Sequence, residues 1–139
     1  MPPLSILLKP ASSGCNLRCA YCFYADEAKA RTIPNYGRMP EAVSHALIEK
    51  AVEAAEGSVT FLFQGGEPTL AGLDFFRDFV AHVKKTVPPN LAVYYAIQTN
   101  GTLLDQEWCR FFKENRFLAG LSPDGSREFH NRFRLDGAG

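Results

Sequence analysis

The chain has 139 residues, which is enough for one domain or for part of a larger one. Its hydrophobic content of 46% can fill a packed core and excludes a low-complexity chain. Fifteen basic and fifteen acidic residues give a formal net charge of zero, so no overall field favours nucleic acid or an anionic membrane. No stretch approaches the ~18 consecutive apolar residues of a membrane helix. We therefore expect no nucleic-acid partner and no membrane partner.

Strand-like and helix-like patterns alternate along the chain. Residues 4–8 form a short apolar run, which predicts the first strand. Residues 23–39 have a mixed composition with turn-forming residues and predict a long crossover connection. Helical spacing of the apolar residues predicts a helix over residues 40–56, and Gly57 ends it.

Three more strands and two more helices are expected after this helix. Runs of β-branched, aromatic and other apolar residues predict the strands at residues 59–64, 91–97 and 117–121. An amphipathic pattern predicts a helix over residues 73–83, and Asp105 can cap a further helix that carries Trp108. Because the strands are nearly continuous apolar runs, we expect an α/β fold in which helices pack outside a parallel sheet.

Every unusual polar motif directly follows a predicted strand. The motifs are a cysteine-rich loop at residues 15–22, Gly-Gly-Glu-Pro at 65–68, Gln-Thr-Asn-Gly at 98–101 and Ser-Pro-Asp-Gly at 122–125. In a parallel α/β barrel the loops after the strands share the carboxyl face, where active sites form. We therefore expect these motifs, which lie far apart in the sequence, to line one site.

Three cysteines in the first of these loops, Cys15, Cys19 and Cys22, have the spacing Cys-x3-Cys-x2-Cys. So tight a loop can turn three thiolates toward one point, as soft metals and iron–sulfur clusters require. In a cubane cluster, three protein ligands leave one iron open to a small molecule. A zinc knuckle and disulfides are the alternatives. Structural zinc sites usually have a fourth Cys or His ligand, and no such residue stands at zinc-finger spacing here. Disulfides are typical of short secreted chains, but the sequence begins with no signal-like apolar segment.

The loop at residues 65–68 has the features of a ligand contact. Gly65 and Gly66 lack a Cβ, so a ligand can approach their backbone closely. A side chain at Gly66 is expected to block that approach and to leave a cluster on the cysteines intact. Glu67 can accept a hydrogen bond from an ammonium group. Directly after a second strand and behind the cysteine loop, this motif resembles the radical S-adenosylmethionine superfamily.

The resemblance implies a [4Fe–4S] cluster on Cys15, Cys19 and Cys22, with S-adenosylmethionine as the second cofactor. In that family the amino and carboxylate groups of S-adenosylmethionine chelate the open iron, and the Gly-Gly-Glu loop holds the amino group. One electron then cleaves S-adenosylmethionine, and the resulting 5′-deoxyadenosyl radical takes a hydrogen atom from the substrate.

A narrower resemblance extends along almost all of the chain. The motifs that carry it are at residues 9–24, 63–73, 98–103 and 120–125. They are similar to those of anaerobic sulfatase-maturating enzymes, which oxidise a Cys or Ser of a sulfatase to formylglycine. The resemblance implies that residues 1–139 are the amino-terminal part of a partial (β/α)6 barrel, truncated after about the fourth strand. The family's proton acceptor and auxiliary-cluster domain would lie beyond Gly139, so we expect the 139 residues alone to be inactive on a sulfatase.

The resemblance also suggests contacts to S-adenosylmethionine, several of which have a simpler alternative. Tyr21 would meet the adenine or only pack the loop, and the backbone of Gly66 would contact the methionine amino group. Ser122 would bond the ribose or the carboxylate, or only end a strand. Arg134 would bind the carboxylate by its planar fork, or lie on a solvated basic surface. Two further residues are candidates for the same cavity: Gln64 and Asn100.

The remaining cysteine and the histidines are expected to have no role in the site. Cys109 should be a small buried hydrophobic residue beside Trp108. The histidines lack metal-binding spacing and should lie on helix faces or in a loop: His45, His82 and His130. We expect a cytoplasmic enzyme with a sulfatase polypeptide and a reductant such as flavodoxin or ferredoxin as partners. A radical enzyme acting on another ribosomal peptide, and a non-catalytic iron–sulfur or zinc-binding module, are the alternatives.

Overall fold

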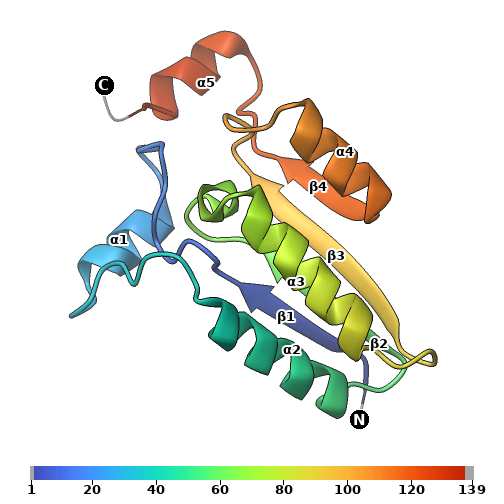
Figure 1. The fold of residues 1–139 in the computed structure, drawn as a ribbon. Helices are drawn as coiled ribbons and strands as arrows, with labels where there is room; N and C mark the ends of the chain where they lie inside the picture. Colours follow the sequence, from blue (N-terminus) through green and yellow to red (C-terminus); the bar gives the residue numbers. More distant parts are fainter. Residues whose placement is uncertain (1, 137–139) are drawn as a thin grey trace.

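A computed structural model describes residues 2–136 and contains one sheet of four parallel strands in the order β1-β2-β3-β4 (Figure 1). The strands are β1 (Leu4–Leu8), β2 (Ser58–Phe63), β3 (Ala92–Thr99) and β4 (Phe117–Leu121). Each neighbouring pair runs parallel. The α/β class and the parallel sheet predicted from the sequence are therefore confirmed, and the predicted strand ends are correct to within two residues.

Three longer helices, α2 (Glu41–Ala54), α3 (Leu73–Thr86) and α4 (Gln106–Glu114), cover one face of the sheet (Figure 1). They begin where the sequence predicts. The carboxylate of Asp105 caps α4 by accepting a hydrogen bond of 2.9 Å from the backbone N–H of Trp108. Among residues 2–136 no helix is both long and apolar enough to cross a membrane.

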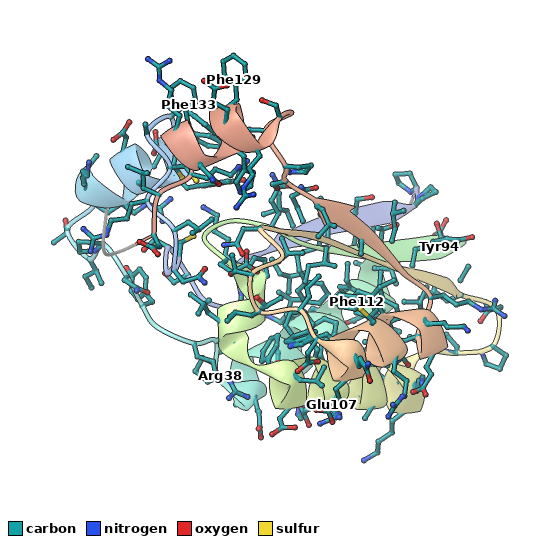
Figure 2. The ribbon with its side chains drawn as sticks, turned by 90° about the horizontal axis from the view of Figure 1, so that it is seen from above. Arg38, Tyr94, Glu107, Phe112, Phe129 and Phe133 are labelled. Atoms are coloured by element: carbon teal, nitrogen blue, oxygen red, sulfur yellow. The ribbon has the colours of Figure 1, made fainter. Side chains whose placement is uncertain are left out.

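The core lies between the sheet and these helices. Alternate side chains of a strand point to the same face, and those of Phe61 and Phe63 on β2 are fully buried against α3. The Phe63 ring packs edge-on against Phe76 and Phe79, with centroids 4.9 Å and 5.1 Å apart. The opposite face is more open, and Tyr94 of β3, labelled in Figure 2, is 59% exposed. Packing against the helices therefore holds the strands in place, and with them the carboxyl ends from which the loops of the site begin.

Two short helices, α1 (Phe23–Lys29) and α5 (Arg127–Phe133), are not predicted by the sequence pattern. Each has seven residues, too few to show a helical period or to be stable alone. Figure 2 shows α5, with Phe129 and Phe133 labelled, well away from the helix layer that carries Phe112. Ser126 caps α5 by accepting from the backbone N–H of Phe129.

The segment after α5 pairs with the cysteine loop. The backbone N–H of Arg18 donates to the carbonyl of Leu135 at 2.6 Å, and that of Ala20 donates to the carbonyl of Phe133 at 2.9 Å. An antiparallel bridge between Leu17 and Asp136 continues this pairing. Leu135 and Asp136 are thus paired with the cysteine loop, and residues 137–139 lie outside the described range.

The prediction that Cys109 is buried is wrong, because its thiol is exposed. Successive residues of a helix are rotated by about 100°, and Trp108 takes the buried side of α4. The next residue therefore faces solvent. The histidines lie on helices, and the rings of His45 on α2 and His82 on α3 stack with centroids 3.8 Å apart.

Candidate active site

The polar motifs that follow the strands meet at the carboxyl end of the sheet, around one cavity of ≈ 210 Å³. Its walls come from the cysteine loop, the loops after β2, β3 and β4, and the residue that ends α5. All the site residues predicted from the sequence line it: Cys15, Cys19, Tyr21, Cys22, Gln64, Gly65, Gly66, Glu67, Asn100, Ser122 and Arg134. The structure thus brings them together, and the role of each remains a prediction.

The three cysteines of the loop carry free thiols. Burial raises the pKa of Cys15. The backbone N–H of Leu17, which donates to its Sγ at 3.4 Å, has the opposite, smaller effect on this pKa. Burial also raises the pKa of Cys19, although the Arg134 guanidinium acts in the opposite direction. Burial thus disfavours the free thiolates of these two cysteines, and a metal centre that binds them must displace their protons.

The donor set fits an iron–sulfur cluster. Within the described part of the chain, no group of three or more His, Cys, Asp and Glu residues is arranged to hold a single metal ion. The thiolates that hold a cubane bind different irons, so they stand further apart than the ligands of one ion. Cys15, Cys19 and Cys22 all reach the same cavity. This arrangement suits a [4Fe–4S] cluster whose fourth iron has no protein ligand.

Glu67 is buried, with 1% of its surface exposed, and it joins the loops after β2 and β3. Its Oε1 accepts from the backbone N–H and the hydroxyl of Thr69 at 3.1 Å and 2.6 Å, and from the hydroxyl of Thr99 at 2.7 Å. Its Oε2 accepts from the backbone N–H of Asn100 at 2.8 Å. Most of its acceptor capacity is thus used inside the protein, and Oε2 alone retains capacity for a ligand.

Gly66 lies where the loop after β2 touches the base of the cysteine loop. Its φ of +58° favours glycine, and a Cβ at this position would lie 2.3 Å from the carbonyl oxygen of Gly14. That same oxygen accepts a hydrogen bond of 2.7 Å from the backbone N–H of Glu67. From the sequence alone, the close approach of a ligand explains the need for glycine at this position. The structure shows that the two loops themselves require it.

We accordingly expect Gly66→Ala to reduce cluster loading severalfold, and not only ligand binding, because its Cβ must push the cysteine loop away. Gly57→Ala is the matched control: its φ of +77° imposes a similar cost of about 1–2 kcal/mol, but nothing lies within 4 Å of its Cβ. Iron and sulfide per chain after anaerobic reconstitution measure the effect. Full loading of Gly66→Ala, with S-adenosylmethionine binding alone reduced, would support the simpler ligand explanation.

The loops after β3 and β4 complete the wall. The Nδ2 of Asn100 donates to Asn16 Oδ1 at 2.9 Å and lies 3.9 Å from the Sγ of Cys15, so this side chain supports the cysteine loop. The Nε2 of Gln98 donates to the hydroxyl of Ser122 at 2.7 Å. Ser122 is therefore held in place and keeps its own O–H as a donor for a ligand.

Tyr21, Asp124 and Arg134 form a polar group beside Cys19. The Tyr21 hydroxyl donates to Oδ2 of Asp124, and the Nε of Arg134 lies 3.0 Å from the same oxygen. Desolvation and then this hydrogen bond raise the pKa of Tyr21 to about 12. The hydrogen bond from Tyr21 and the adjacent guanidinium of Arg134 lower the pKa of Asp124. Arg134 also places Nη1 at 3.7 Å from the Sγ of Cys19.

Several residues of the site are missed by the sequence analysis. Asp124 stands in the Ser-Pro-Asp-Gly motif, which is a usable signal, but that motif directs attention to Ser122. Other side chains that line the cavity lie inside the predicted motifs or next to them but are not singled out by their residue type: Leu17, Phe23, Tyr24, Gln98 and Thr99. Nothing in the sequence distinguishes these apolar, aromatic, amide and hydroxyl side chains from residues that only pack the loops.

Comparison with known proteins places this site in a family. The family model described as the Radical SAM superfamily matches residues 10–137. The cysteine-type anaerobic sulfatase-maturating enzyme of Clostridium novyi (strain NT) is 52% identical over 136 residues, which are 98% of this chain and 36% of that enzyme. The serine-type anaerobic sulfatase-maturating enzyme of Klebsiella aerogenes is 34% identical over 137 residues, covering 99% of this chain and 33% of that enzyme.

A solved structure, native anSMEcpe with bound AdoMet and Cp18Cys peptide, has the same fold. It matches with a TM-score of 0.90 and 48% identity, over 99% of this chain and 36% of that one. The chain thus spans about a third of the length of these relatives. The expected partial radical SAM barrel is confirmed, and the matched range includes every residue of the cavity. The chain belongs to the radical SAM superfamily.

Proposed function

We propose that this chain forms the S-adenosylmethionine-binding part of an enzyme that oxidises a cysteine of a sulfatase to formylglycine. The observation that carries the proposal is the identity of 52% with a cysteine-type sulfatase-maturating enzyme along nearly the whole chain. The identity with a serine-type enzyme is 34% over a similar length. This difference favours cysteine over serine as the side chain that is oxidised.

In this proposal Cys15, Cys19 and Cys22 hold a [4Fe–4S] cluster. When bound, the cluster would supply the single electron that splits S-adenosylmethionine and so prepares the removal of a hydrogen atom from the target side chain. The protein supplies position. The backbone carbonyl of Gly66 and the Oε2 of Glu67, two residues that line the cavity, would accept from the methionine amino group.

Other side chains of the cavity would orient the rest of S-adenosylmethionine. The planar guanidinium of Arg134 suits the carboxylate, and Ser122 can donate to the carboxylate or the ribose. Tyr21 already donates its hydroxyl to Asp124, so it would meet the adenine by its ring or backbone. Gln64 lines the same cavity as a further polar contact.

We propose the cytoplasm as the compartment, because the cysteines of the described residues are free thiols and such thiols persist in a reducing environment. The electron would come from a reductant such as flavodoxin or ferredoxin. The second partner would be a sulfatase polypeptide, and the peptide named with the solved relative supports this class of substrate.

The test uses the full-length gene product, reconstituted anaerobically and supplied with reductant and S-adenosylmethionine. Two sulfatase peptides that differ only in Cys or Ser at the target position serve as matched substrates. We expect 5′-deoxyadenosine and a formylglycine mass from the Cys peptide, at a rate about tenfold or more above that of the Ser peptide, which is a difference of ~1.4 kcal/mol in barrier. Cleavage of S-adenosylmethionine with neither peptide changed would reject sulfatase maturation and direct attention to another peptide substrate.

A further inference from the structure

The carboxylate of Asp124 connects two segments that are more than a hundred residues apart in the chain. Tyr21 lies between two cysteines of the loop, and its hydroxyl donates to Asp124 at a separation of 103 residues. On the other side, the Nε of Arg134 forms an ion pair with the same carboxylate oxygen at 3.0 Å. The backbone N–H of Asp124 donates to Nδ1 of His130 at 3.4 Å, which ties this loop to α5.

Arg134 is fixed in place by these contacts and by its backbone. Only 13% of its side chain is exposed, and its Cζ lies 5.6 Å from the centroid of the Tyr21 ring. Its backbone N–H donates to the carbonyl of His130, and the preceding carbonyl accepts from Ala20 of the cysteine loop. Its guanidinium thus has one end on Asp124 and the other, Nη1, at 3.7 Å from the Sγ of Cys19.

We propose that Asp124 is a positioning residue that holds Arg134 against the sulfur of Cys19, and that the two opposite charges together set the reduction potential of the cluster. This inference deepens the proposed function and rests on it. Hydrogen bonds and charges next to the ligand sulfurs are the means by which a protein tunes such a centre.

The sign of each contribution follows from the charge. Reduction adds one negative charge to the cluster, so a cation beside a ligand sulfur stabilises the reduced form and an anion destabilises it. At such short range, and with side chains only 13% and 24% exposed, these effects are weakly screened. Arg134 should therefore raise the potential, and Asp124 should partly offset it while keeping the guanidinium in place.

The experiment compares Asp124→Asn and Arg134→Gln with Glu128→Gln in the full-length gene product. Glu128 is exposed in the first turn of α5, so its replacement removes one negative charge without touching the group. The readout is the midpoint potential, measured without S-adenosylmethionine, of the cluster whose magnetic resonance signal changes when S-adenosylmethionine is added. This criterion separates it from any auxiliary cluster.

We expect Arg134→Gln to lower the potential. Asp124→Asn should raise it, because the asparagine keeps an oxygen that can hold the guanidinium but no longer carries the negative charge. Each shift should correspond to about a tenfold change in the reduction equilibrium, which is 59 mV for one electron. Glu128→Gln should stay close to the unmodified protein, and the double variant should lie between the two single variants. If Asp124 and Arg134 only held the two segments together, the midpoint potentials of the two variants would shift in the same direction, or neither potential would shift.

Shifts of equal sign, or potentials unchanged in both variants, overturn the inference. If Asp124→Asn does not retain a cluster, Arg134→Gln alone still tests the proposal. An unchanged or higher potential in that variant contradicts it. Normal cleavage of S-adenosylmethionine with unshifted potentials would reject this inference alone. A protein with no cluster that responds to S-adenosylmethionine would reject the proposed function and this inference with it.

Discussion

Cys19→Ala should leave the protein without a cluster at this site, whereas Cys109→Ala should load it in full. The cubane needs three thiolates here, and the variant offers only two, Cys15 and Cys22. The variant also removes the sulfur that lies 3.7 Å from Nη1 of Arg134, so the segment after α5 loses a contact with the loop. We expect near-complete loss of the visible absorption and of the iron and labile sulfide that belong to this site.

Cys109 is the matched control, because it is a free cysteine of the same chain but is exposed on α4, outside the cavity. The comparison separates loss of a ligand from loss of any thiol. A Cys19→Ala protein that keeps its cluster at the level of the unmodified protein would contradict the assignment. So would stoichiometric zinc without labile sulfide in anaerobically purified, unmodified protein.

Glu67→Gln should lower the free energy of unfolding by about 3 kcal/mol. Four donors from Thr69, Thr99 and the backbone of Asn100 converge on this buried carboxylate. A glutamine has one oxygen and one NH2 group, so in either orientation the NH2 faces at least one of these donors. A buried donor is then unpaired, and the other hydrogen bonds lose the assistance of the charge.

Urea-induced unfolding of the metal-free protein measures this effect without interference from cluster loading. Glu114→Gln, on the exposed side of α4, is the control and should change the free energy of unfolding by no more than about 0.5 kcal/mol. We also expect weaker S-adenosylmethionine binding by Glu67→Gln, because Asn100 and Gly66 are no longer held in register. An unchanged urea midpoint would mean that Glu67 contributes nothing to folding and acts on the ligand alone.

The elements of the sheet and the three longer helices could be predicted from the sequence. Their patterns are local: a run such as residues 59–64 has the composition of a buried strand, and α3 shows its apolar side every three to four residues. The short helices α1 and α5 escape this reasoning, because seven residues show no period and the helix forms only by packing. Ser126 gives a cap signal for α5, but a single Ser does not distinguish a cap from a turn.

The site was predictable to the extent that its residues belong to motifs at strand ends. Parallel strands place those ends on one side of the sheet, so the cysteine loop and the Gly65–Glu67 loop must lie close together. The sequence does not predict which atoms of these loops are in contact. The carbonyl oxygen of Gly14 already leaves no room for a side chain at Gly66, whether or not a ligand is bound.

The sequence by itself determined the parallel α/β class and the side of the sheet on which the site forms, and it predicts the three cysteines as cluster ligands, because each of these depends on residues that are neighbours in the chain. Only the tertiary structure decided that Asp124 connects Tyr21 to Arg134, and that residues 133–136 pair with the cysteine loop. These contacts span more than a hundred residues. Their geometry depends on how the strands and helices pack, and no local pattern records it.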